Sequence, residues 1–128
     1  LWDGKFEWAF TGTDEERGFM MVDAIGLDEI RVTYQGQTLS KEFLRTYYRG
    51  SAWEKALNVA KERAKSGEDF VRICRQDLGQ SPEPISPSVR LAAEMMYLSF
   101  VNDLHRLVRG THLYDSALNL AHWAREFA

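Results

Sequence analysis

The sequence lacks most of the features that identify a metal or cofactor protein. Among its 128 residues Cys74 is the single cysteine, so an internal disulfide is excluded and a cysteine-based zinc site lacks its partners. The three histidines form no His-x-x-x-His or His-Glu-x-x-His pattern. The nine glycines match neither a dinucleotide-binding nor a P-loop pattern, and no Gly-x-Ser-x-Gly elbow occurs. We therefore expect no metal, no cofactor and no catalytic residue that a motif identifies.

Long hydrophobic runs are also missing. A membrane helix needs about 18 or more uncharged apolar residues, and the longest candidate, residues 92–101, is interrupted by Glu94. The first five residues show neither a basic stretch nor a small-residue cleavage pattern, although a removed signal stays open because the chain does not begin with Met. We expect no membrane association and a reducing cytoplasm as the location.

The composition is that of a folded globular protein. Apolar residues make up 45% and charged residues 27%, and sixteen residues are aromatic. We expect one α+β domain over residues 1–128, β-rich in residues 1–75, with a Pro-rich connection over 76–88 and a helical hairpin over 87–128. Its small antiparallel sheet has about 4–5 strands that pack against helices.

The strands follow from alternation of apolar and polar residues. Phe6, Trp8 and Phe10 fall on one face of a first strand, which predicts that this face is buried. A polar loop then leads to an apolar run, which together predict a hairpin. The further strands are expected over residues 19–25, 30–34, 38–39 and 70–75.

Capping residues indicate where the helices begin. Ser40 is placed to cap a helix through Tyr48, and residues 51–54 form a capping box for a helix that Gly67 ends. Ser86 with the following proline opens a long helix to Arg109, and apolar residues from 113 to 127 predict a last helix antiparallel to it. The apolar face of the long helix is wider than one partner helix needs, so a homodimer is expected.

Charge is divided unevenly along the chain, whose formal net charge is −3. Residues 1–29 hold eight acids and two bases, whereas residues 30–75 hold ten bases and five acids. Acidic turns can be solvated surface or can engage a basic protein. The acidic residues that we predict to bind a protein partner are Asp14, Glu15, Glu16, Asp28 and Glu29.

Arginines and tyrosines are close together in the basic part of the chain, near Tyr34, Tyr47 and Tyr48. Arginine forks and aromatic faces suit phosphate, nucleobase or carboxylate recognition, although the same side chains could simply pair with neighbouring acids. A pI of about 5.6 disfavours broad nucleic-acid binding but not a focused anion pocket. The predicted anion-binding residues are Arg31, Arg45, Arg49, Arg72 and Arg75.

Two functional hypotheses follow. The first is a nonenzymatic protein-binding module, such as an inhibitor, an immunity protein or an accessory subunit, with exposed tryptophans as interface anchors. The alternative is recognition of a nucleic acid or a small phosphorylated ligand by the arginine and tyrosine surface. An enzyme ranks below both, with His105, Asp103 and Cys74 as its weak candidates and a two-histidine site at His105 and His112 as a remote one.

Overall fold

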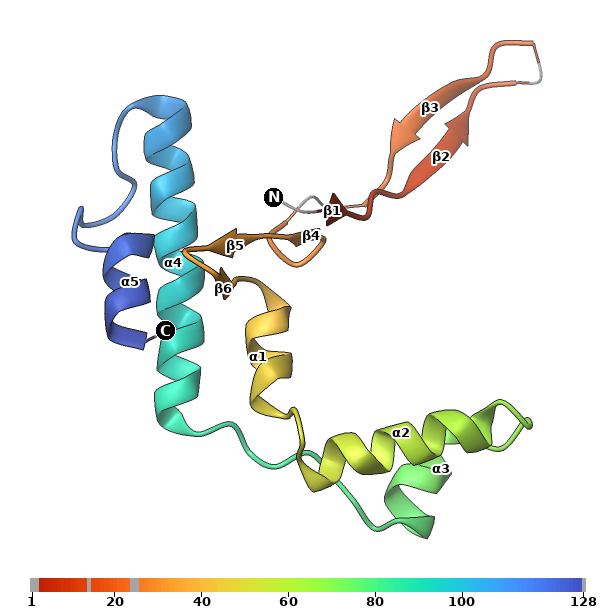
Figure 1. Cartoon of the computed structure of the whole chain (residues 1–128). Coiled ribbons are helices and arrows are strands. Elements are labelled where there is room, and N and C mark those ends of the chain that lie inside the picture. Colours follow the sequence, from red (N-terminus) through yellow and green to blue (C-terminus); the bar gives the residue numbers. More distant parts are fainter. Residues whose placement is uncertain (1–2, 14, 24–25, 128) are drawn as a thin grey trace. The chain divides into compact units, whose positions relative to one another are not determined.

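The computed structural model describes residues 3–13, 15–23 and 26–127, and its fold class is α+β, as the sequence predicts. The chain divides into two compact units (Figure 1). Unit 1 comprises residues 1–43 and 91–128, and unit 2 comprises residues 44–90. That these units behave as one domain stays a prediction. No helix in the described part of the chain is long and apolar enough to cross a bilayer.

Within the described residues the strands form three separate antiparallel pairs, where the sequence suggested one small sheet. The pairs are β1 (Asp3–Gly4) with β4 (Ile30–Arg31), β2 (Trp8–Thr11) with β3 (Gly18–Met21), and β5 (Thr33–Tyr34) with β6 (Gln37–Thr38). The strand expected over residues 30–34 is interrupted at Val32, whose carbonyl accepts from the Leu39 amide at 2.9 Å. All three pairs belong to unit 1.

The β2–β3 hairpin is the longest of these pairs. Trp8 lies opposite Met21 and Phe10 lies opposite Phe19, and directly opposed residues project from the same face of an antiparallel pair. The connecting loop begins at Gly12, which has a φ of 87°. A side chain there would overlap the carbonyl group of Glu16, so the loop needs glycine at this position.

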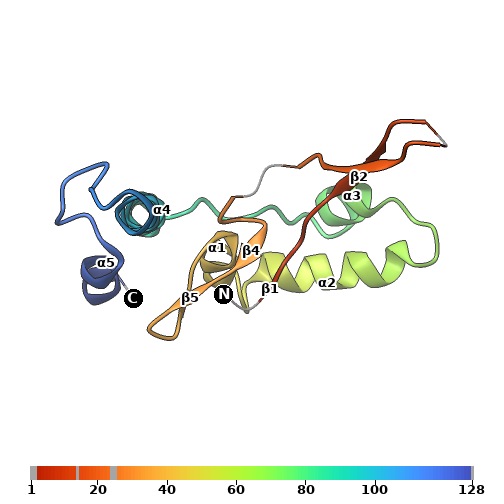
Figure 2. The same ribbon diagram turned by 90° about the horizontal axis from the view of Figure 1, so that it is seen from above.

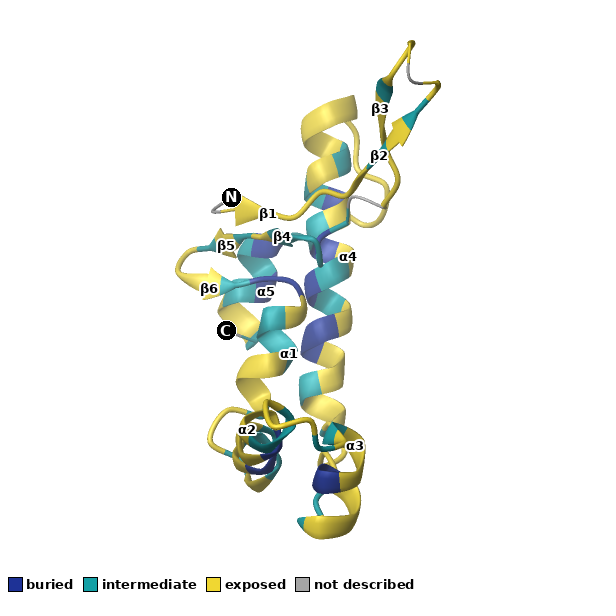
Figure 3. Cartoon of the chain, turned by 90° about the vertical axis from the view of Figure 1, so that its right-hand side faces the viewer, coloured by how far each residue is buried: buried dark blue, intermediate teal, exposed yellow. Residues whose placement is uncertain are grey.

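The core of unit 1 lies against α4 (Pro87–Arg109) and α5 (Leu120–Phe127), which run side by side (Figures 1 and 2). The indole of Trp123 is 1% exposed and donates to the Ala92 carbonyl at 2.8 Å. Its ring meets Phe43 edge to face, at 5.7 Å between centroids. Figure 3 shows buried positions along α4 and α5. The buried members of the core are Leu27, Leu39, Met96, Leu120 and Trp123.

A buried amide fixes the segment between these two helices. Asn102 is fully buried, and its side chain donates to the Asp115 and Leu118 carbonyls at 2.9 and 2.7 Å. Its oxygen accepts from the Leu113 and Tyr114 amides at 2.8 and 2.9 Å. The last helix therefore begins at Leu120 and not near residue 113 as its apolar pattern suggested, because Asn102 holds residues 113–118 in a loop.

Unit 2 contains α2 (Ala52–Ala64), α3 (Phe70–Arg72) and a short π-helix, η1 (Ile73–Asp77). The prediction of a strand over residues 70–75 is wrong. Asp69 caps a helix by accepting from the Arg72 amide at 2.7 Å. Ile73 and Cys74 are both buried against Ala60, which a strand would prevent because its successive side chains point to opposite faces.

The helices before this turn largely follow the sequence prediction. Helix α1 (Lys41–Tyr47) is present as expected, but Ser40 before it has a φ of 72° and not the extended backbone of an N-cap residue. The Ser51 hydroxyl accepts from the Glu54 amide at 3.1 Å, but the Glu54 carboxylate returns to the Gly50 amide at 2.6 Å instead of to Ser51. The helix that begins there ends before Gly67, whose φ is 91°.

Candidate functional site

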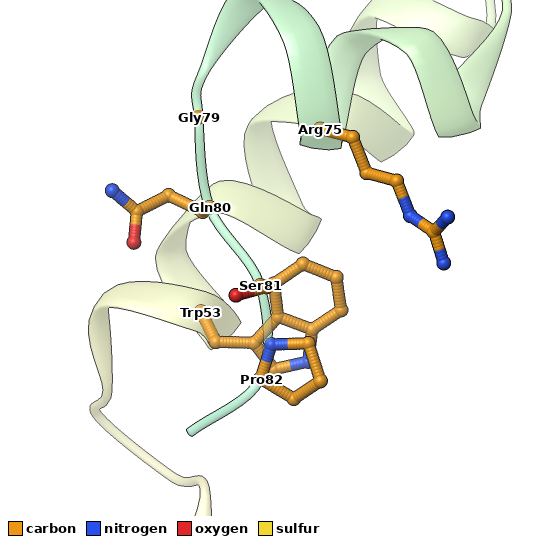
Figure 4. Close-up of a pocket in the computed structure, with 6 residues that line it drawn as sticks. All are labelled: Trp53, Arg75, Gly79, Gln80, Ser81 and Pro82. Atoms are coloured by element: carbon orange, nitrogen blue, oxygen red, sulfur yellow. The ribbon is translucent and has the colours of Figure 1, made fainter. Parts of the chain in front are cut away.

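Unit 2 contains a pocket of about 390 Å³. This volume is within the range of small-molecule sites. The residues that line it are Trp53, Arg75, Gly79, Gln80, Ser81 and Pro82 (Figure 4). They come from the first turn of α2, from η1 and from the segment that follows η1. The pocket therefore depends on the helical turn that the sequence pattern did not predict.

Local structure holds the pocket walls in place. Trp53 packs against the buried cluster of Ala60, Ile73 and Cys74 while it also lines the pocket, so its indole is a supported platform. The chain reverses after η1, where Gly79 has a φ of 60° and the Gln80 amide donates to the Cys74 carbonyl at 3.0 Å. This bond brings residues 79–82 alongside Trp53.

Arg75 is the charged group of this pocket. No hydrogen bond or ion pair engages its guanidinium within the described residues, and the side chain is exposed. In Figure 4 the guanidinium and the Gln80 side chain lie to either side of the Trp53 ring. A guanidinium suits a phosphate or carboxylate, and an indole suits a planar ring, so this pair suits a ligand that carries both.

The other predicted arginines are not gathered at this pocket. Arg31 belongs to unit 1 and lies 3.4 Å from a carboxylate oxygen of Asp3. Arg72 lies 3.7 Å from Glu68, whose pKa is lowered chiefly by its hydrogen bonds from Arg63. The remaining two, Arg45 and Arg49, are exposed and do not line the pocket.

Several of the predicted acidic residues are engaged inside the fold. The carboxylate of Asp28 accepts from the Tyr97 hydroxyl at 2.6 Å and from the Lys41 amide at 2.8 Å. Burial, followed by this hydrogen bond, raises the pKa of Tyr97. Glu29 accepts from the Gly26 amide at 2.8 Å. That Asp28 and Glu29 also bind a protein partner stays a prediction.

Two further predicted acids, Glu15 and Glu16, lie in the hairpin loop. Glu15 and Glu16 are exposed between β2 and β3, while Asp14 lies outside the described residues. Glu15 and Glu16 belong to the loop of the same hairpin that carries Trp8, Phe10 and Phe19. An acidic tip and an aromatic face are thus combined in one element.

The weak catalytic candidates are dispersed. Cys74 is buried in unit 2, whereas His105 and Asp103 lie on α4 in unit 1. A ring nitrogen of His105 lies 2.7 Å from the Thr111 carbonyl, and Asp103 accepts from the Leu120 amide at 2.9 Å. His112 and Asp103 line a second pocket, of about 340 Å³. No group of three potential metal ligands is found among the described residues.

The β2–β3 hairpin presents an aromatic face to solvent. We define this face as Trp8, Phe10, Phe19 and Met21, which form two of the four opposed pairs of the hairpin. Trp8 is 57% exposed, Phe10 72% and Phe19 71%, and the two phenylalanine rings lie 5.0 Å apart. The apolar side chains do fall on one face of the strand, as expected, but the prediction that this face is buried is wrong. Figure 3 shows exposed and intermediate residues along both strands.

Two comparisons with known proteins return nothing: no family model and no solved structure matches this chain. A curated protein of Archaeoglobus fulgidus is 36% identical over 115 residues, which cover 89% of this chain. That protein is named as a candidate phosphoribosylaminoimidazole-succinocarboxamide synthase. The chain spans only 30% of the length of this relative.

Proposed function

We propose that this chain is a protein-binding, accessory part of a synthase of the class for which the archaeal relative is named. The observation that carries the proposal is the extent of the similarity, which takes in 89% of this chain but 30% of the relative. The described residues gather no motif-based catalytic set. A chain of this kind contributes to such an enzyme by binding its other parts. We place this function in the cytoplasm.

A chimera tests the proposal. In it, this chain replaces the aligned segment of the Archaeoglobus fulgidus relative, and formation of phosphoribosylaminoimidazole-succinocarboxamide is followed by mass spectrometry. We expect the chimera to form this product, because related sequences adopt the same local fold and present the same binding surfaces. The matched control is the relative with the aligned segment deleted, which should form none.

Two results would argue against this function. One is a chimera that is soluble and melts cooperatively but forms no product while the intact relative does. The other is a relative that keeps the activity of the intact protein after its aligned segment has been deleted, since the segment would then contribute nothing to synthesis.

A second candidate function is recognition of a phosphorylated ligand in the pocket of Trp53 and Arg75. The name of the relative refers to a phosphoribosyl group joined to an aminoimidazole ring. The Arg75 guanidinium, which has no partner among the described residues, matches the phosphate, and the indole of Trp53 matches the planar ring. Of the five predicted arginines, Arg75 is the one that lines the pocket.

The corresponding experiment is a nitrogen-15 NMR titration with phosphoribosylaminoimidazole carboxamide and with its dephosphorylated form. We expect saturable shifts of the Trp53 indole and of the amides of residues 79–81, and roughly tenfold weaker binding without the phosphate. Arg75→Gln should cause a similar roughly tenfold loss, because it removes one charge-assisted contact. Lys61→Gln, at an exposed site on α2, is the control. Equal binding of both ligands would eliminate this candidate.

A further inference from the structure

We infer that the β2–β3 hairpin is the surface through which this chain joins the rest of the synthase. The inference rests on the proposed function and gives it a location. The occupant is a region of the enzyme outside the aligned segment that offers an apolar groove, a basic rim and an open strand edge. Three features of the hairpin lead to this description.

The first feature is the apolar face. Trp8 and Phe19 form a shallow apolar depression, and the Phe10 ring lies tilted against the Phe19 ring. Scattered exposed apolar residues are ordinary on a protein surface, but two opposed pairs form a contiguous patch. Tryptophan and phenylalanine are also residue types that dominate the energy of protein interfaces. This face therefore predicts an apolar groove in the partner.

The second feature is the isolation of the two strands. Backbone pairing in this ladder joins β2 only to β3 within the described residues, so each strand keeps an outer edge. A two-stranded hairpin is marginally stable in water at best, and three or more strands or a packed layer are usually needed. Addition of the hairpin to a further strand would satisfy the unpaired backbone groups of that edge.

The third feature is charge. Residues 1–29 carry eight acids and two bases, and the exposed Glu15 and Glu16 extend this negative charge to the tip of the hairpin. Lys5, close to the start of β2, is itself paired with Glu7, which raises the pKa of Lys5. A partner surface with a basic rim would complement this element and speed its association at low salt.

The length of the relative indicates who the partner is. The similarity takes in 30% of that protein, and the remaining part lies outside the aligned segment. An interface between the aligned segment and that remaining part would cover a surface that this chain by itself leaves exposed. The hairpin carries the three most exposed aromatic side chains of the described residues, Trp8, Phe10 and Phe19, whereas Trp123 in the core is 1% exposed.

The test mixes this chain with the relative from which the aligned segment has been deleted, and binding is measured by isothermal titration calorimetry. We expect a one-to-one complex. Trp8→Ser combined with Phe19→Ser should weaken it at least thirtyfold, and Glu15→Gln combined with Glu16→Gln should weaken it several-fold at low salt only. The matched control is Leu107→Ser on α4, a side chain that is 79% exposed and should change binding less than threefold.

Should the deleted relative be insoluble alone, co-expression gives the same answer. The wild-type chain and the Leu107→Ser variant should keep it soluble, and the Trp8 and Phe19 double variant should not. Complex formation that ignores the hairpin substitutions would overturn the inference and leave the proposed function intact. Self-association of the chain through Trp8 and Phe19, without capture of the deleted relative, would overturn it in favour of a second copy as the occupant.

Discussion

The β2–β3 hairpin and the α4–α5 core of unit 1 have similar side chains but opposite surroundings. Trp123 is 1% exposed in the core, whereas Trp8 is 57% exposed on the hairpin. Phe43 packs against Trp123, while Phe10 and Phe19 pack mainly on one another. Other side chains of this chain bury the core, whereas they leave the aromatic face of the hairpin exposed. An amphipathic pattern thus identifies a face that needs cover without showing which molecule provides it.

The largest expected difference between the two regions is the cost of removing each tryptophan. Trp123→Ala should lower the free energy of unfolding by about 4 kcal/mol, because it leaves a cavity and removes the bond to the Ala92 carbonyl. Trp8→Ala should lower it by less than about 0.5 kcal/mol in the free chain, since its side chain is largely in water. Urea denaturation of both variants measures the two values. Equal losses would mean that the hairpin is part of the core.

The next effect concerns the polar centre of the core. Asn102→Ala should cost about 3 kcal/mol, because it leaves the Asp115 and Leu118 carbonyls and the Leu113 and Tyr114 amides without their side-chain partner. Asn102→Asp keeps the acceptor for the Leu113 and Tyr114 amides, but it buries a carboxylate and sets one of its oxygens against two carbonyl oxygens, so it should cost at least as much. Thermal denaturation compares the variants. A negligible loss in Asn102→Ala would show that the 113–118 loop does not depend on this side chain.

A smaller effect is expected from the bond between Tyr97 and Asp28. Tyr97→Phe should cost about 1 kcal/mol at neutral pH. The folded pKa of Tyr97 lies above the ordinary tyrosine value of 10.0, so the protonated form favours the folded state. Wild-type stability should therefore fall as pH rises above about 10, whereas that of Tyr97→Phe should fall less. Parallel alkaline melting curves would contradict this reading.

The smallest expected effect on global stability comes from the hairpin loop. Gly12→Ala introduces a clash with the Glu16 carbonyl and should disturb the hairpin locally, with little change in the melting temperature. Gly36→Ala meets no close neighbour and has only the strain of a positive φ, about 1 kcal/mol. Because the β5–β6 turn adjoins the core residue Leu39, Gly36→Ala should nevertheless lower the melting temperature more. The reverse order would mean that the hairpin is coupled to the core.

Much of the fold followed from the sequence because the relevant signals are local. Ser51 and Gly67 mark the ends of α2, and the α4 helix occupies the expected residues 87–109. The alternation around Trp8 correctly predicted a strand. These signals depend on neighbours within a few positions, which the sequence displays directly.

The errors arise where distant contacts decide. Residues 70–75 alternate like a strand, but the Asp69 cap and burial of Ile73 and Cys74 beside Ala60 make them helical. The last helix begins later than its apolar pattern predicts because Asn102, which lies on α4, holds the preceding residues in a loop. The pocket shares this limitation, since Arg75 was predicted from its charge while Trp53 was seen only as a possible anchor. Their meeting requires the turn at Gly79.

Hydrogen exchange of the hairpin amides tests the central claim most directly. The exchange rates of residues 8–11 and 18–21 are compared between the free chain and the chimera that carries this chain within the archaeal relative. We predict fast exchange in the free chain and at least hundredfold protection in the chimera, with unchanged protection of the α4 amides around Met96. Equally fast exchange of the hairpin in both proteins would contradict the account.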